Sequence, residues 1–194
     1  IRGVGGQGNL FFGKVLAQVA FLAGYDDRNI LKGETHGMAQ MGGPVISTFG
    51  CGEVFSPALV PGTANVLIAM EKAEVLRPGF LDLLEPGGTV LMADTRILPH
   101  GLKPEAYPSD EAIAAQLEGY RVVSVDVLSI ALNLGDPKGR CANVAMLGVL
   151  STLPPFDVVP EAVWLQALRG ISRKPALWDL NHAAFMAGRG MQKG

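Results

Sequence analysis

Runs and spacings of apolar residues divide the chain into predicted strands and helices. Continuous apolar runs are typical of strands buried on both faces of a parallel sheet. Runs of this kind occur at residues 65–70 and 89–93, and residues 120–125, Y-R-V-V-S-V, predict a further strand. Apolar residues spaced three and four apart are typical of helices. Predicted helices cover residues 10–22, 73–84, 111–118, 127–134, 142–153, 161–168 and 176–187.

The segment between the first helix and the first apolar run predicts an antiparallel element. Short strands are expected at residues 28–31 and 45–49. After a Gly-Cys-Gly turn, residues 53–55 predict a further strand that would pair with 45–49 as a hairpin. This hairpin would lie beside the parallel strands.

The order of these elements predicts the fold class. Strands alternate with helices, and the last third of the chain is helical. We therefore expect an α/β fold: a Rossmann-like, doubly wound, mostly parallel sheet with a β-hairpin insertion and C-terminal helices, in a single domain over residues 1–194. A glycine-rich turn of this kind usually follows five or six apolar strand residues, and only Ile1 and Arg2 precede Gly3. Most of the first strand is thus expected to be missing from the sequence.

Composition adds an indication of a partner protein. Apolar residues make up 48% of the chain and charged residues only 18%. So few charges favour a surface that another subunit covers, although a large α/β core would also raise the apolar fraction. The net charge of −2 does not indicate the basic surface that binding to nucleic acid requires. No apolar run reaches the length that a membrane-spanning helix needs.

The two cysteines do not predict a metal site. Cys51 and Cys141 lie 90 positions apart, outside any C-x-x-C spacing, so neither an iron–sulfur cluster nor a zinc site is expected within this chain. Two unpaired cysteines fit a reducing, cytoplasmic setting.

The first motif with chemical meaning is a glycine loop at the start of the chain. It reads G-V-G-G-Q-G, and its candidate ligand-binding residues are Gly3, Gly5, Gly6, Gln7 and Gly8. Such a loop before a helix can hold a phosphate of a dinucleotide. An acidic partner for the ribose could be Asp26 or Asp27, but both precede the next predicted strand instead of ending it. The alternative is that the glycines only let the helix pack tightly on the sheet.

The second motif is a polar, glycine-rich loop at residues 32–44, K-G-E-T-H-G-M-A-Q-M-G-G-P. His36 could donate or accept a proton near neutral pH, or serve only as a hydrogen-bonding residue. The methionines of the loop suit a surface that another subunit contacts. Candidate substrate, coenzyme or interface residues are Lys32, Glu34, His36, Gly37, Met38, Gln40, Met41, Gly42 and Gly43. Further along, Asn143 could cap or cross-link the start of a helix.

The two loops together resemble one family. G-V-G-G-Q-G followed by K-G-E-T-H-G-M-A-Q-M-G-G-P-V is similar to the gamma-type subunit of the 2-oxoacid:acceptor oxidoreductases, such as the pyruvate, indolepyruvate and phenylglyoxylate enzymes. The similarity continues through N-V-L-I-A-M-E, L-E-P-G-G-T-V and N-V-A-M-L-G-V-L, and so covers nearly the whole chain.

The resemblance implies one subunit of a heteromeric enzyme. In this family, other subunits hold thiamine diphosphate with Mg²⁺ and [4Fe-4S] clusters, coenzyme A is a co-substrate, and ferredoxin or another acceptor is reduced. The second loop would face those subunits. Many relatives have arginine where this chain has Met41, which favours a more apolar, aryl 2-oxoacid. The alternatives are a stand-alone NAD(P)- or FAD-dependent oxidoreductase and a non-catalytic assembly module.

Overall fold

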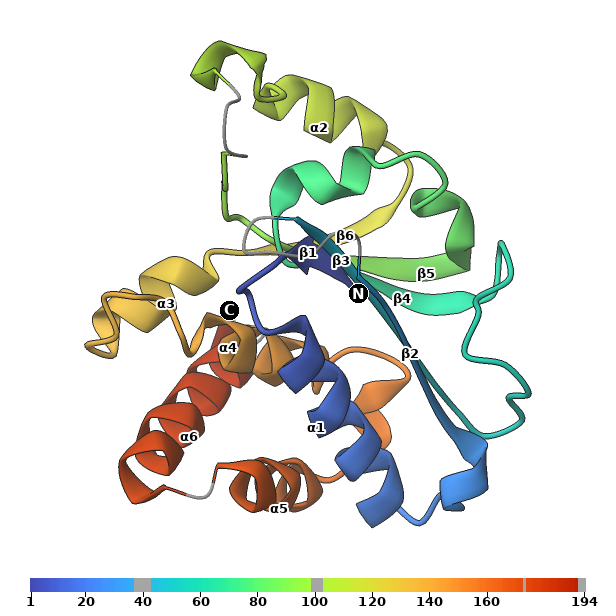
Figure 1. Cartoon of the computed structure of the whole chain (residues 1–194), viewed down its shortest axis with the longest axis vertical. Coiled ribbons are helices and arrows are strands. Elements are labelled where there is room, and N and C mark those ends of the chain that lie inside the picture. The colour runs from blue at the N-terminus through green and yellow to red at the C-terminus, as the bar shows by residue number, and fades with distance from the viewer. Residues whose placement is uncertain (37–42, 99–102, 173, 192–194) are drawn as a thin grey trace.

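A computed structural model describes residues 1–36, 43–98, 103–172 and 174–191, which form a six-stranded sheet covered by helices (Figure 1). The strands are β1 (Arg2–Val4), β2 (Ile30–His36), β3 (Pro44–Cys51), β4 (Ala64–Ala69), β5 (Leu84–Ala93) and β6 (Arg121–Val125). The α-helices are α1 (Asn9–Leu22), α2 (Asp110–Gln116), α3 (Val127–Asn133), α4 (Ala142–Leu150), α5 (Glu161–Ile171) and α6 (Pro175–Gly190). Short 3₁₀ turns are η1 (Asp27–Asn29), η2 (Lys72–Leu76), η3 (Leu81–Leu83), η4 (Pro104–Ala106) and η5 (Phe156–Val158).

The sheet is mostly parallel, as the sequence predicts. Its strand order is β2-β3-β1-β4-β5-β6. β1, β4, β5 and β6 pair in parallel, whereas β3 is antiparallel to both of its neighbours, β1 and β2. The α/β class and the antiparallel element are therefore confirmed.

The pairing predicted for the hairpin is wrong. β3 pairs with β2 over their whole lengths, from Ile30↔Cys51 to His36↔Val45, while residues 53–55 form no strand. Gly52 has a positive φ of 94°, which turns the chain away from β3 after Cys51. Residues 32–36 of the predicted second loop therefore belong to β2 itself, because β2 runs to His36, and the rest of that loop joins β2 to β3 in sequence.

The helix predicted at residues 73–84 is also wrong. η2 and η3 occupy this stretch, since Pro78 cannot continue a helical hydrogen-bond ladder and Gly79 has φ 75°. The turn predicted at residues 86–88 is an irregularity inside β5, where the register against β4 shifts between Ala64 and Val66. The remaining predicted strands and helices are present, with ends shifted by a few residues.

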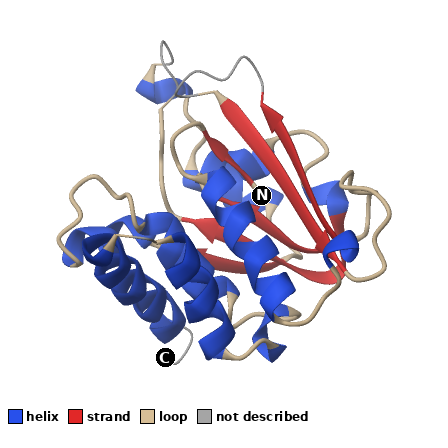
Figure 2. Ribbon diagram, turned by 60° about the horizontal axis from the view of Figure 1, so that its bottom comes forward, coloured by secondary structure: helices blue, strands red, loops and turns tan. Residues whose placement is uncertain are grey.

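Helices cover both faces of the sheet (Figure 2). α1 and the C-terminal helices form the larger core with side chains such as Phe12, Leu91, Leu147 and Trp164. On the other face, the 3₁₀ turns and α2 form a smaller core with Leu67, Val90 and Ile113, among others. Successive strand residues point to opposite faces, so β4 and β5 contribute alternately to the two cores.

Within the larger core, α4 is a central helix. All of its residues from Asn143 to Leu150 are buried. This explains why its sequence is apolar on every side, since only a helix surrounded by protein has no polar face. Among the described residues, no helix combines the length and the apolar character that crossing a bilayer requires.

Candidate functional site

The carboxyl ends of β1, β4 and β5 meet at one edge of the sheet, where ligands bind in many doubly wound folds. The glycine loop leaves β1 at this edge and leads into α1. Gly6 has φ 105° and Gly8, the N-cap of α1, has φ 82°. Both positions need glycine because other side chains avoid this backbone region. The sequence-predicted turn into a helix is thus confirmed.

The glycine loop is held closed by its own glutamine. The amide N–H of Val4 donates to Gln7 Oε1 at 2.7 Å, and Gln7 Nε2 donates to the carbonyl oxygen of Met70 at 2.6 Å. The side chain of Gln7 therefore bridges the ends of β1 and β4.

Asn143 lies against the same loop from α4. A Cβ atom added to Gly8 would lie 2.2 Å from Asn143 Nδ2, so the amide occupies the space that only a glycine leaves free. Asn143 is 7% exposed, and its Oδ1 has no hydrogen-bond partner among the residues that the structure describes. The N-cap of α4 is Cys141, so Asn143 does not cap that helix; it joins the starts of α4 and α1.

Gly43, near the end of the second loop, contacts the first loop at this edge. The amide N–H of Gly5 donates to the carbonyl oxygen of Gly43 at 2.8 Å. Lys32 pairs with Glu34 at 2.6 Å on β2, and His36 ends that strand opposite Val45. The structure therefore brings together the two motifs that the sequence singles out. Of the predicted loop residues, Gly37, Met38, Gln40, Met41 and Gly42 lie outside the described residues.

The acidic residues considered as ribose ligands lie elsewhere. Asp26 caps η1, accepts hydrogen bonds from Arg28, and follows the far end of α1. A helix of 14 residues is about 21 Å long. Asp26 and Asp27 are therefore separated from the glycine loop by the length of α1, which argues against a dinucleotide held between them.

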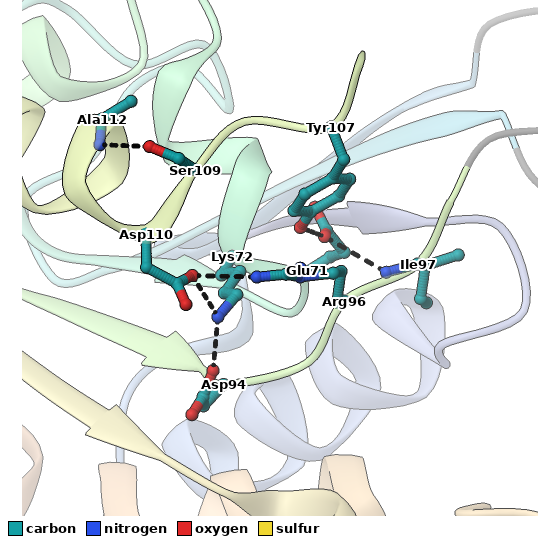
Figure 3. A network of polar contacts seen from close by, with 9 residues as sticks. All are labelled: Glu71, Lys72, Asp94, Arg96, Ile97, Tyr107, Ser109, Asp110 and Ala112. Atoms are coloured by element: carbon teal, nitrogen blue, oxygen red, sulfur yellow. Dashed lines mark hydrogen bonds and ion pairs between the residues drawn. The ribbon is translucent and has the colours of Figure 1, made fainter. Parts of the chain in front are cut away.

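Beside the two loops, a polar network follows β4 and β5 (Figure 3). Lys72 Nζ lies 3.0 Å from Asp94 Oδ1 and 2.7 Å from Asp110 Oδ1, and Arg96 also pairs with Asp110 at 3.1 Å. Lys72 follows β4, Asp94 follows β5 and Asp110 begins α2. The network thus ties the segment after β5 to the carboxyl edge.

Glu71 is the buried member of this network. It is 2% exposed and accepts hydrogen bonds from the Tyr107 hydroxyl and from the amide N–H of Ile97, the latter at 3.3 Å. Burial raises the pKa of Glu71 above its ordinary value, and these hydrogen bonds only partly offset that. Burial and the neighbouring carboxylate also raise the pKa of Tyr107. The pair can therefore hold a proton at the edge of the sheet.

The sequence analysis did not single out this network, although a signal for it exists. Glu71, Asp94 and Asp126 each follow a parallel strand within two residues of its end. Ionisable residues directly after buried strands lie at one edge, since parallel strands end on the same side.

The chemistry of this edge is hydrogen bonding and proton exchange. Lys72 and Arg96 are each paired with a carboxylate here, whereas Lys32 is paired with Glu34 further from this edge on β2. Within the described ranges, no three His, Cys, Asp or Glu side chains converge as a metal ion requires. Cys51 and Cys141 are free thiols.

Similar sequences identify the family. The model of the family described as pyruvate ferredoxin/flavodoxin oxidoreductase matches residues 1–191. The indolepyruvate oxidoreductase subunit IorB of Archaeoglobus fulgidus is 35% identical over 154 residues, which cover 77% of this chain and 73% of that protein. The protein of the same name from Methanothermobacter thermautotrophicus is 30% identical over 194 residues, 98% of this chain and 94% of the relative.

Solved structures share the fold. The 2-oxoglutarate:ferredoxin oxidoreductase from Magnetococcus marinus, solved with 2-oxoglutarate, coenzyme A and succinyl-CoA bound, matches with a TM-score of 0.70 and 18% identity, over 99% of this chain and 30% of that chain. The gamma subunit of a keto/oxoacid ferredoxin oxidoreductase from Geobacter sulfurreducens matches with a TM-score of 0.61 and 19% identity, over 96% of this chain and 90% of that one. The gamma-type resemblance predicted from the two loops is confirmed: this chain belongs to the pyruvate ferredoxin/flavodoxin oxidoreductase family.

Proposed function

We propose that this chain is the gamma-type subunit of a multisubunit 2-oxoacid oxidoreductase of the cytoplasm. The complex converts a 2-oxoacid, coenzyme A and two oxidised ferredoxins to an acyl-CoA, CO₂, two reduced ferredoxins and a proton. Thiamine diphosphate with Mg²⁺ and the [4Fe-4S] clusters belong to the partner subunits. The observation that carries this proposal is the family match over residues 1–191.

For the substrate, we propose an aryl 2-oxoacid such as indolepyruvate. Support comes from the two relatives named indolepyruvate oxidoreductase subunits, at 35% and 30% identity. Met41 adds to it, because an apolar residue in the second loop suits an aryl group better than an arginine does. Replacing Met41 with arginine would then lower kcat/KM for indolepyruvate relative to pyruvate, whereas Met191→Arg, at an exposed position on another part of the chain, serves as the control. An unchanged ratio would remove this support.

The geometry of the glycine loop favours a subunit over a stand-alone dinucleotide enzyme. Gln7 crosses the loop, Asn143 covers Gly8, and the acidic residues lie beyond the far end of α1. In this arrangement the glycines serve close packing of α1, α4 and the sheet. We further propose that the second loop, which the Gly5–Gly43 hydrogen bond places beside this packed region, faces the partner subunits.

The test is reconstitution of the complex. The chain is purified alone and together with partners that bind thiamine diphosphate and iron–sulfur clusters, and CoA-dependent reduction of ferredoxin is followed with indolepyruvate, pyruvate and 2-oxoisovalerate. We expect no turnover from the chain alone and turnover once the partners are present, fastest with indolepyruvate.

Calorimetry with NADH, NADPH and FAD distinguishes the alternatives. Micromolar binding of a dinucleotide by the isolated chain, or full oxidoreductase activity without partners, would overturn the proposal. A complex whose activity is the same with and without this chain would show that the chain takes no part in the reaction.

A further inference from the structure

In the described part of the chain, the sheet ends at β2 on one side and at β6 on the other (Figure 1). The β2 edge is long and regular. β2 has seven residues and no proline, and it pairs with β3 from Ile30↔Cys51 to His36↔Val45 without a register shift. Edge strands are usually short, bulged or interrupted by proline, because a straight edge can pair with a further strand. β2 therefore has the form of an edge that accepts a partner strand.

The hydrogen bonds of β3 show which backbone groups of β2 face outward. The N–H of Ser47 bonds to Ile1 on the β1 side, so the next residue, Thr48, faces β2 and its register partner Gly33. Alternate residues of β2 face β3 in the same way, and those between them face away from the sheet. The outward groups are the N–H and C=O of Lys32, Glu34 and His36 and the C=O of Ile30.

The two charged side chains of this edge lie on either side of Gly33. Lys32 Nζ is 2.6 Å from Glu34 Oε1, and the two side chains are 28% and 25% exposed. Residues two apart on a strand share a face. For this pair it is the face that α1 covers, since a Cβ added to Gly13 would lie 3.2 Å from Lys32 Cδ. The segment Lys-Gly-Glu is complementary in charge to a second copy of itself that runs in the opposite direction.

We propose that the outer edge of β2 pairs with β2 of a second copy of this chain, antiparallel and about a two-fold axis at Gly33. Lys32 then lies opposite Glu34 of the second copy, and Glu34 lies opposite Lys32 of that copy. Each lysine contacts the glutamate of its own strand and that of the other strand. The two sheets become one continuous sheet. This interface goes beyond the proposed function and does not depend on it.

Charge selects this register over its neighbours. A shift by one residue would place outward backbone groups opposite inward ones, so no ladder could form. A shift by two residues would place Lys32 opposite Lys32 of the second copy, or Glu34 opposite Glu34. Like charges directly opposite one another destabilise a strand pair, whereas opposite charges stabilise it. The edge thus fits a second copy of itself, while an unrelated strand would need the same two charges in reverse order.

The other edge of the sheet has no such complementarity. β6 has only five residues. The N–H of Asp94 bonds to the carbonyl oxygen of Val125, so Val125 and alternate residues of β6 face β5. Val122 and Ser124 face outward, and neither is charged. β6 therefore serves as the control edge.

A charge swap on β2 tests the interface by sedimentation equilibrium of the purified full chain. We expect a dimer, and Lys32→Glu or Glu34→Lys alone should raise its Kd by at least about tenfold, because each puts like charges opposite one another. The combined variant Lys32→Glu/Glu34→Lys should restore the dimer. Lys138→Glu, at an exposed position before α4, is the matched control and should leave the Kd unchanged.

A proline on each edge tests the backbone pairing. Glu34→Pro removes an outward N–H and leaves the ladder to β3 intact, so it should abolish the dimer, whereas Ser124→Pro on β6 should retain it. Amide hydrogen exchange by NMR gives a second readout. Exchange at Lys32, Glu34 and His36 should slow as the chain concentration rises, while exchange at Gly33, which faces β3, should not change.

Three results would overturn the proposal. The first is a chain that stays monomeric at all concentrations. The second is a dimer that survives Glu34→Pro or that the charge swap fails to restore. The third is a chain that is monomeric alone but whose Lys32 and Glu34 amides become protected in the reconstituted complex, which would assign the edge to a strand of another subunit. None of these measurements depends on catalytic activity, so they leave the test of the proposed function separate.

Discussion

At the scale of single residues, the position of Glu71 directly after a strand determines its burial and the pKa of its carboxyl group. A glutamate directly after an apolar strand reaches the carboxyl edge, and burial there raises its pKa. Its carboxyl group is stabilised by the Tyr107 hydroxyl and the Ile97 amide instead of a cation. A buried acid that holds its proton more tightly in the folded chain makes stability depend on pH.

The sign of this dependence follows from the raised pKa. The folded chain retains the Glu71 proton to higher pH than the unfolded chain, so the free energy of unfolding falls as pH rises from about 4.5 through the folded pKa. One proton contributes a slope of at most about 1.4 kcal/mol per pH unit. Glu71→Gln keeps an acceptor for Tyr107 and should remove this part of the slope in urea titrations from pH 4 to 8. Glu118→Gln, at an exposed position, is the control; identical curves for both variants would refute the assignment.

Gly8 is a second residue whose identity has a specific physical cause. Gly8 and Gly24 flank α1 with φ of 82° and 94°, but only Gly8 faces another side chain, the amide of Asn143. Alanine in this backbone region costs about 1–2 kcal/mol at either position. We expect Gly24→Ala to lose about that much, and Gly8→Ala to lose about 2 kcal/mol more. In an Asn143→Ala background the extra loss should shrink, which denaturation of the double mutant measures. Additive losses would contradict the contact.

At the scale of elements, α4 and α6 pack so closely that two glycines form their interface. A Cβ on Gly148 would lie 2.1 Å from the carbonyl oxygen of Phe185, and a Cβ on Gly188 would lie 2.0 Å from that of Ala145. Each glycine thus admits the backbone of the other helix. The buried helix α4 and the final helix α6 therefore approach each other backbone to backbone at these two glycines.

This packing predicts that glycine-to-alanine substitutions destabilise the chain at the α4–α6 interface and do not destabilise it elsewhere in a helix. Gly148→Ala and Gly188→Ala should each destabilise the chain by about 3 kcal/mol or more, because the helices must separate. Gly170→Ala, in α5 with nothing within 4 Å of the added Cβ, should be neutral or stabilising by up to about 1 kcal/mol. Thermal unfolding by circular dichroism compares the three, and a destabilised Gly170→Ala or a tolerated Gly188→Ala would contradict the interface.

At the scale of the whole molecule, two cores share one sheet. Leu91 lies in the larger core and Leu67 in the smaller, on opposite faces of adjacent strands. Trp164 is in the larger core and Trp178 packs against it, so tryptophan fluorescence reports on that side, whereas circular dichroism reports on the entire chain. We propose that residues 1–194 form one folding unit, because neither core has a sheet of its own.

Replacing one leucine with alanine in either core tests whether the chain unfolds as a single unit. Leu67→Ala and Leu91→Ala should each lower the free energy of unfolding by about 3–5 kcal/mol. In both variants the fluorescence and circular dichroism transitions should coincide. A Leu67→Ala chain that loses circular dichroism before its tryptophan signal changes would show two separately folding layers.

The sequence by itself determined the α/β class, most strands and helices, the turn from the glycine loop into α1 and the family, because periodicity, turn residues and motif spacing are local properties. It misassigned the hairpin and the helix at residues 73–84, and did not single out Glu71 or Lys72. Only the tertiary structure decided that β2 pairs with β3, that Gln7 and Asn143 contact the glycine loop and its neighbours, and that Glu71 is buried at the carboxyl edge. These features depend on contacts between segments far apart in sequence, and their energies arise only when the sheet and helices are packed together.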